Sequence, residues 1–186
     1  MTLTVLNFKG GQGKTSIALS LAEHFQLGII VNEPYSSVGL ALEQDSYFYA
    51  KNKLPNADNV VYDFGGGVSA IMLEAIRQSD FVIIPTLPEA ADLYVTEQCY
   101  RSVKEHVDLE KIIVVANKCR AKDFATVVER FKDCKVIQIR PSKAIENIYL
   151  KGLSIEEQAK KSALSAYTYK KVLEDFKALF VTISNK

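Results

Sequence analysis

A seven-residue segment near the N-terminus combines glycines with charged residues in a pattern suited to phosphate. It reads Lys9-Gly10-Gly11-Gln12-Gly13-Lys14-Thr15. Because glycine has no side chain, backbone N–H groups in such a segment can turn inward around phosphate oxygens. Lys14 can bring its charge to the β- and γ-phosphates of a nucleotide, and the Thr15 hydroxyl can be one ligand of octahedral Mg²⁺. The sequence therefore predicts a nucleotide-binding loop that extends from Gly10 to Ser16.

A single aspartate, Asp63, lies between the apolar run Val60-Val61-Tyr62 and the segment Phe64-Gly65-Gly66-Gly67. A buried strand that ends in one carboxylate is typical of the Walker B motif, which holds Mg²⁺ through a water molecule. The glycines would let the following backbone approach the γ-phosphate and move between states. Asp63 is thus the second predicted magnesium residue, with the alternative that it merely ends a strand.

The phosphate loop departs from the ordinary pattern in an informative way. Phe8 occupies the position of the first glycine of an ordinary loop, and Lys9 follows it. This arrangement resembles the deviant Walker A motif of the ParA and MinD family of P-loop ATPases. In that family the first lysine crosses a dimer interface to the partner's nucleotide. The resemblance implies an ATP-sandwich homodimer in which Lys9 neutralises phosphate charge in trans.

The segment Ile29–Pro34 is similar to the second strand of that family, which usually ends in Asp-x-Asp-Pro-Gln. Val31, Glu33 and Tyr35 replace the two aspartates and the glutamine. Because the aspartate before proline orients the attacking water in the family, the resemblance implies that role for Glu33, on a longer side chain. Slow hydrolysis is expected. Two alternatives remain open, namely that Glu33 belongs to an ordinary surface loop and that the chain binds nucleotide with little turnover.

Further similarity to the family extends to about residue 155. Ser79–Glu89 resembles a strand and proline-containing loop near the dimer interface, and Arg140–Glu146 and Gly152–Ile155 resemble the C-terminal region. Asn117-Lys118 looks like a guanine-reading motif, but Arg120 replaces the aspartate that guanine requires. The resemblance instead implies that Asn117 and the backbone near Pro141 contact adenine, so that the cofactors are ATP and Mg²⁺.

Short β-rich runs that alternate with helix-period segments must position these residues. Strands are expected near residues 2–8, 28–32, 59–63, 80–85, 111–116 and 135–139, with helices between them. This alternation predicts a doubly wound α/β fold, with a mainly parallel sheet flanked by helices on both faces. We expect a single P-loop ATPase domain over residues 1–186. Loops at the carboxyl ends of the strands should line one site. Apolar residues at helical spacing from Tyr169 to Ile183 predict a final amphipathic helix that packs on the sheet.

Composition and charge bear on location and partners. The longest apolar runs are much shorter than the roughly 20 residues that span a bilayer, and Met1–Asn7 has the pattern of a first strand and not of a signal peptide. We therefore expect a cytoplasmic protein.

The two halves of the chain differ in charge. Residues 1–110 contain 7 Lys/Arg and 14 Asp/Glu, whereas residues 111–186 contain 16 Lys/Arg and 8 Asp/Glu. This polarity indicates a polyanionic partner, either DNA or an anionic membrane, with scattered solvated lysines as the alternative. The candidate phosphate contacts are Arg120, Lys122, Lys151, Lys160, Lys161, Lys170 and Lys171.

The resemblance and the charge pattern together favour a ParA-type positioning ATPase, associated with the nucleoid when ATP is bound. Its dimer would bind DNA without sequence preference, and a ParB-like or other small activator protein would stimulate hydrolysis during partition of a plasmid, chromosome or other cargo. A MinD-like ATPase that cycles on a membrane is the first alternative. The mixed charges of the final helix, with Glu174 and Asp175 among its lysines, disfavour a membrane anchor. A ligase or amidotransferase of the same superfamily usually has a longer chain.

Overall fold

The computed structural model describes residues 1–185, except for the side chains of Tyr149 and Lys151. Within this part of the chain, all paired strands run parallel in one seven-stranded sheet of order β3-β2-β4-β1-β5-β6-β7. The strands are β1 (Thr2–Leu6), β2 (Gly28–Val31), β3 (Phe48–Tyr49), β4 (Val60–Phe64), β5 (Phe81–Thr86), β6 (Ile112–Ala116) and β7 (Lys135–Gln138).

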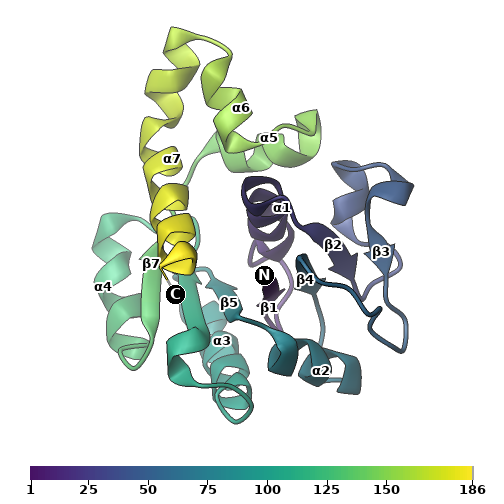
Figure 1. Ribbon diagram of the computed structural model, residues 1–186. Coiled ribbons are helices and arrows are strands. Elements are labelled where there is room, and N and C mark those ends of the chain that lie inside the picture. Colours follow the sequence, from purple (N-terminus) through teal and green to yellow (C-terminus); the bar gives the residue numbers. More distant parts are fainter. Residues whose placement is uncertain (186) are drawn as a thin grey trace.

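Helices cover both faces of this sheet (Figure 1). The α-helices are α1 (Lys14–Phe25), α2 (Ala70–Gln78), α3 (Ala90–Val103), α4 (Ala121–Arg130), α5 (Lys143–Lys151), α6 (Ile155–Lys160) and α7 (Ala163–Ser184). Short 3₁₀ turns are η1 (Ser37–Leu40), η2 (Gln44–Ser46) and η3 (Leu109–Lys111). Apolar residues of α1, α5, α6 and α7 form one buried cluster with the sheet, and those of α2, α3 and α4 form another on the opposite face. The predicted doubly wound α/β fold is therefore confirmed.

Alternation of side chains along the strands builds these two clusters. In β6, Ile113 and Val115 face α7, whereas Ile112 and Val114 face the layer that contains α3. All four are fully buried. Burying one such side chain contributes about 1.5–3 kcal/mol. Strands covered on both sides need apolar residues at every position, which explains the uninterrupted apolar runs in the sequence.

The expected strands agree with the observed ones within one or two residues at each end, apart from β3. This strand has only two residues, Phe48 and Tyr49, and pairs with β2 at the edge of the sheet.

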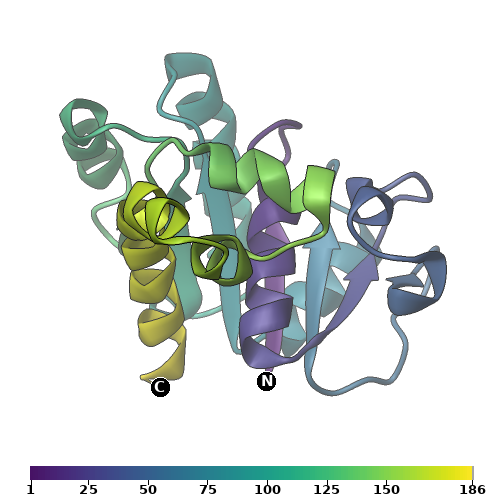
Figure 2. The same cartoon turned by 90° about the horizontal axis from the view of Figure 1, so that it is seen from above.

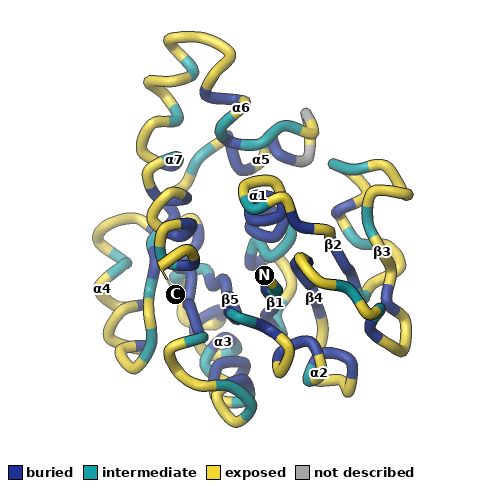
Figure 3. The backbone as a smooth tube through the Cα atoms, in the orientation of Figure 1, coloured by how far each residue is buried: buried dark blue, intermediate teal, exposed yellow. Residues whose placement is uncertain are grey.

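The predicted final amphipathic helix is also confirmed, although α7 begins earlier than expected, at Ala163. Val172, Phe176 and Leu179 are buried against the sheet, whereas the first turns are exposed (Figure 3). Across the described residues, no helix has the length and apolar character needed to cross a membrane.

The order of the strands fixes the position of the loop after β1. In the sheet β1 lies between β4 and β5, with β2 beyond β4. The chain thus leaves β1 toward one edge and later fills the other, so the loop after Leu6 lies where the connections diverge. In doubly wound sheets this crevice, at the carboxyl ends of the strands, is where ligands bind. The N-terminus and the C-terminal end of α7 lie at the opposite end of the molecule (Figure 2).

Candidate nucleotide-binding site

The predicted phosphate loop connects β1 to α1 and is held by glycine geometry at its end. Gly13, at the N-cap of α1, has a φ of 87°, in the left-handed region that glycine tolerates best. A Cβ atom at this position would also collide with the side-chain amide of Asn117. Gly13 is therefore required both for the turn and for the close approach of β6. Lys14 and Thr15 consequently lie in the first turn of α1, at the positive end of the helix dipole.

Asn7 anchors the start of the loop, a role that the sequence patterns did not indicate. Its buried amide nitrogen donates hydrogen bonds to the Pro85 carbonyl and the Thr96 hydroxyl, both at 2.8 Å. Its oxygen accepts a hydrogen bond from the Lys9 backbone N–H at 2.9 Å. A polar residue directly after a buried strand is the signal that could have identified it. Asn7 thus ties the loop to β5 and α3.

Lys14, Thr15 and Asp63 meet at the base of a cavity of about 370 Å³. The Thr15 hydroxyl donates to Asp63 Oδ2 at 2.7 Å, and the Ser37 hydroxyl donates to Thr15 Oγ1 at 3.2 Å. Burial raises the pKa of Asp63 to about 6, and the nearby Glu33 charge adds to this, whereas the Thr15 hydrogen bond and the Lys14 charge lower it. Hydroxyl and carboxylate oxygens are the donors that Mg²⁺ prefers, and a cation would relieve the cost of the buried charge. The donor set therefore fits the predicted ion.

Glu33 is exposed at the end of β2, and its side chain lies along the rim of the same cavity. A Cβ atom on Gly65 would collide with the Glu33 carboxylate, so glycine at this position leaves room for the acid. The structure thus brings Glu33 to the cavity that holds Lys14 and Asp63. Its electrostatic effect on the pKa of Asp63 reflects this proximity.

Asn32, which the sequence patterns also did not identify, joins the strand ends that carry Glu33 and Asp63. Its amide nitrogen donates to the Gly65 carbonyl, and its oxygen accepts from the Gly65 N–H, both at 2.9 Å. This two-point contact resembles a backbone ladder that continues one residue past β2 and β4. It fixes the distance between the two carboxylates across the cavity.

Replacing Asn32 by alanine should lower the free energy of unfolding by about 1–3 kcal/mol, because both polar groups of Gly65 lose their partner. Urea denaturation measures this change. Asn52→Ala, which removes an exposed asparagine, is the matched control and should change the free energy by less than about 0.5 kcal/mol. Equal effects of the two substitutions would show that the Asn32 contact contributes nothing.

A second cavity, of about 510 Å³, opens on the other side of the phosphate loop. It shares Gly11, Gly13 and Ser37 with the first cavity. The remaining lining residues are Ser16, Leu40, Asn117, Lys118, Ile145, Glu146 and Leu150. The two cavities together give a groove with a polar, glycine-lined end and a more apolar end. Such a groove matches a triphosphate joined to a base.

The two residues predicted to contact adenine, Asn117 and Pro141, lie differently relative to the two cavities. Asn117 is buried beside the phosphate loop, and its amide donates to the Gln12 carbonyl at 2.8 Å. It also borders the second cavity. Pro141 is exposed before α5 and is not among the described residues that line either cavity. The structure therefore brings Asn117, but not Pro141, to the groove.

Two loop residues direct their side chains away from the groove. The Gln12 side chain is buried, accepts a hydrogen bond from the Leu87 N–H at 2.8 Å and donates a short one to Asp92. Lys9 Nζ lies 2.8 Å from Asp92 Oδ1, in an ion pair within the same chain. Lys14 Nζ donates to the Lys9 carbonyl at 3.3 Å. Gln12 and Lys9 are thus bound to α3, whereas Lys14 remains at the cavity.

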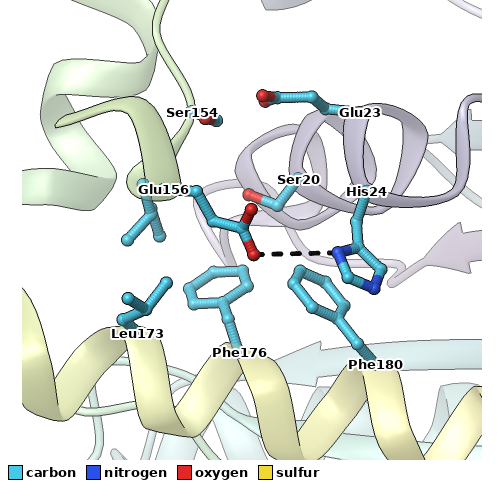
Figure 4. Close-up of a pocket in the computed structure, with 9 residues that line it drawn as sticks. Ser20, Glu23, His24, Ser154, Glu156, Leu173, Phe176 and Phe180 are labelled. Carbon is cyan, nitrogen blue, oxygen red and sulfur yellow. Dashed lines mark ion pairs between the residues drawn. The ribbon is translucent and has the colours of Figure 1, made fainter. Parts of the chain in front are cut away.

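A separate, smaller cavity between α1, α6 and α7 is not a candidate for nucleotide. Figure 4 shows His24 stacked on Phe180, with its Nδ1 facing Glu156. The ring centroids are 3.9 Å apart, and the nitrogen–oxygen distance is 3.8 Å. Its volume of about 120 Å³ is well below the roughly 300 Å³ at which ligand sites begin. These residues join α1 to the C-terminal helices.

Comparison with known proteins bears on the fold. No protein-family model matches the sequence, and no curated protein is significantly similar to it in sequence. Several solved structures, in contrast, have a three-dimensional structure similar to that of this chain. Apo McdA from Cyanothece superimposes with a TM-score of 0.71 at 14% identity, covering 98% of both chains. MinD from Aquifex aeolicus gives 0.68 at 13% identity over 97% of both. MinD from Pyrococcus horikoshii OT3, in complex with Mg-ADP, gives 0.63 at 17% identity over 100% of both.

These similarities lie at the level of the fold, which is that of P-loop NTPases. They agree with the motif resemblance, which was found independently in the residues of the loop. The chain therefore has the fold of the ParA and MinD ATPases, and its phosphate loop carries their deviant Walker A pattern.

Proposed function

We propose that this chain is a Mg²⁺-dependent ATPase that dimerises around ATP and uses the ATP cycle to position a cargo. The observation that carries the proposal is the convergence of Lys14, Thr15 and Asp63 in one cavity, with a 2.7 Å hydrogen bond between Thr15 and Asp63. Packing of the fold does not by itself explain why a lysine and a hydroxyl in the first turn of α1 meet a buried carboxylate of β4. Together they supply a phosphate ligand and two metal ligands.

ATP would occupy the groove formed by the two cavities. Backbone N–H groups from Gly10 to Ser16 would hold the phosphates, and Lys14 would reach the terminal ones. Thr15 and Asp63 would hold Mg²⁺, which neutralises charge on the phosphates when bound. Leu40, Ile145 and Leu150 would pack against adenine, with Asn117 as its polar contact. Guanine would lack its acidic partner, because Arg120 stands in that position.

Hydrolysis would depend on Glu33. Its carboxylate lines the cavity that receives the γ-phosphate and could orient the attacking water. Glu33 is exposed at the cavity rim and carries a longer side chain than aspartate, so slow turnover is expected until a partner protein positions its carboxylate. A ParB-like or other small activator would have this effect.

Three exposed apolar side chains near site residues in the sequence support the dimer. Tyr35 is 96% exposed two residues after Glu33, Val68 is 52% exposed after the glycine triplet, and Tyr94 of α3 is 63% exposed. Exposed apolar side chains, aromatic ones above all, are common in protein interfaces. A second copy facing the first across two ATP molecules would cover all three.

DNA is the proposed anionic partner of the C-terminal half. Six of the seven candidate basic residues, namely Arg120, Lys122, Lys160, Lys161, Lys170 and Lys171, are exposed. The side chain of the seventh, Lys151, lies outside the described residues. Non-specific DNA binding by such residues releases counterions and therefore weakens steeply with salt.

The double variant Lys170→Ala/Lys171→Ala should weaken DNA binding by the ATP-loaded protein and make the slope of log affinity against log salt shallower by about 2, or about 1 per lysine. Fluorescence anisotropy with a random duplex across a salt series measures both. Lys51→Ala/Lys53→Ala removes two exposed lysines from the N-terminal half and is the matched control. No binding by the wild type, or a flat salt response, would rule out the nucleoid proposal.

The membrane-cycling alternative finds less support. The apolar face of α7, including Phe176 and Leu179, is buried against the sheet and is not available to lipid. The alternative of an adaptor with little turnover is separated from an enzyme by a steady-state ATPase assay with and without DNA. Phosphate release that depends on Mg²⁺ and disappears in the Glu33→Gln variant supports the ATPase, whereas binding without release supports the adaptor.

A further inference from the structure

Asp92 lies at the centre of a small hydrogen-bonding network. The network binds Lys9 and Gln12, the two loop residues whose side chains point away from the groove. Asp92 is the third residue of α3, and only 7% of it is exposed. Its carboxylate receives both the Lys9 ammonium, at 2.8 Å, and the Gln12 side-chain amide. Gln12 in turn holds the Leu87 N–H at the end of β5. One buried carboxylate therefore fixes the phosphate loop to α3.

The Lys9–Asp92 contact would compete with a contact in trans. Asp92 of the same chain neutralises the Lys9 ammonium at 2.8 Å, so a phosphate bound to another chain would have to draw the ammonium away from that carboxylate.

Two features of the network make this release possible. Asp92 lies in the first turn of α3, where the helix dipole stabilises a negative charge, and it keeps the Gln12 amide when Lys9 leaves. The Lys9 side chain is also 37% exposed, so its ammonium can leave the carboxylate toward solvent.

We propose that Asp92 is a positioning residue that holds Lys9 in cis and thereby opposes dimerisation until ATP is bound. This inference rests on the proposed ATP-dependent dimer. Neutralising Asp92 should then tighten the dimer, whereas loss of a merely structural contact would weaken it. A tighter dimer in the variant therefore indicates that Asp92 opposes dimerisation, whereas a weaker dimer indicates a merely structural contact.

The test compares Asp92→Asn with a control, Glu97→Gln, which removes a negative charge elsewhere on α3, where Glu97 pairs with Arg101. Dimerisation is measured by sedimentation velocity with Mg²⁺ and a non-hydrolysable ATP analogue. Breaking a partly exposed ion pair should favour the released state by about threefold per protomer, and hence lower the dimer dissociation constant about tenfold. The Glu97→Gln control should not tighten the dimer.

A second experiment tests the Lys9–Asp92 ion pair in the monomer, independently of dimerisation. In nucleotide-free monomer, acetylation of Lys9 followed by mass spectrometry should be about threefold faster in Asp92→Asn than in the wild type. In the wild type, Lys9 should also react more slowly than the exposed Lys51, a comparison that needs no variant.

The outcomes separate the inference from the function on which it rests. Faster acetylation together with a tighter dimer in Asp92→Asn alone supports the inference. Unchanged acetylation, or a weaker dimer in Asp92→Asn, overturns it while leaving the proposed function intact. If the wild type does not dimerise with the ATP analogue at any concentration, the proposed function fails, and with it any role of Asp92 in opposing the dimer.

Discussion

Replacing Lys14 by alanine is expected to lower the affinity for Mg-ATP by at least about 100-fold, whereas Lys9→Ala should lower it by less than about threefold. The two lysines are five residues apart in one loop, but their surroundings differ. Lys14 lines the phosphate cavity, whereas Lys9 is paired with Asp92 outside it. Removing one partner of a largely desolvated charge pair costs about 2–5 kcal/mol, of which about 2.7 kcal/mol corresponds to 100-fold.

Isothermal titration calorimetry with a non-hydrolysable analogue at low protein concentration measures both affinities in the monomer. Lys104→Ala, on the far end of α3, is a suitable control for loss of a lysine and should bind like the wild type. If Lys9→Ala weakens binding as much as Lys14→Ala, then Lys9 acts on the nucleotide of its own chain, and the assignment of separate roles is wrong.

Asp63→Asn is expected to stabilise the metal-free protein while it abolishes the effect of Mg²⁺ on nucleotide binding. Burial raises the pKa of Asp63 from 3.8 to about 6. The folded state therefore holds a proton that the unfolded state has already released between pH 4 and 6, and stability is lost as the pH rises through this window. A shift of roughly 2 pKa units corresponds to about 3 kcal/mol above pH 6. Asparagine keeps the oxygen that accepts the Thr15 hydrogen bond but has no charge to bury.

Urea denaturation in the presence of a chelator, at pH 4.5 and pH 7.5, measures this prediction. The variant should exceed the wild type by about 3 kcal/mol at the higher pH and by much less at the lower pH. Asp58→Asn, in the exposed loop before β4, is the control. A variant that is less stable than the wild type at pH 7.5 would mean that the Asp63 carboxylate stabilises the fold without a cation.

The fold was largely predictable because its strands are buried on both faces and therefore carry continuous apolar runs. The run at Ile112–Ala116 is an example, since each residue must face one of the two helical layers. In contrast, β3 pairs through two residues at the sheet edge, and Phe48 and Tyr49 are both exposed, so no burial pattern marks the strand.

The same distinction applies to the site. Gly13, Lys14 and Thr15 are neighbours in sequence, so their spacing alone predicts a phosphate loop. The contacts that hold this loop and the strand ends beside it join residues far apart in the chain, such as Gln12 to Asp92 and Asn32 to Gly65. Short polar side chains are common on surfaces, and only the sheet order brings Asn32 and Asp92 to their partners. These two residues could not be assigned from sequence, whereas Asn7 directly follows a buried strand, which is a signal in the sequence.

We propose that the deviant loop makes this chain one half of an ATP-dependent dimer. Sedimentation velocity of the wild type with Mg²⁺ and a non-hydrolysable ATP analogue, with Mg-ADP, and without nucleotide tests it most directly. We predict a dimer with the ATP analogue only, and its loss in Lys9→Ala, which still binds the analogue. A wild-type protein that stays monomeric when saturated with the analogue, or a Lys9→Ala variant that dimerises normally, would contradict the claim.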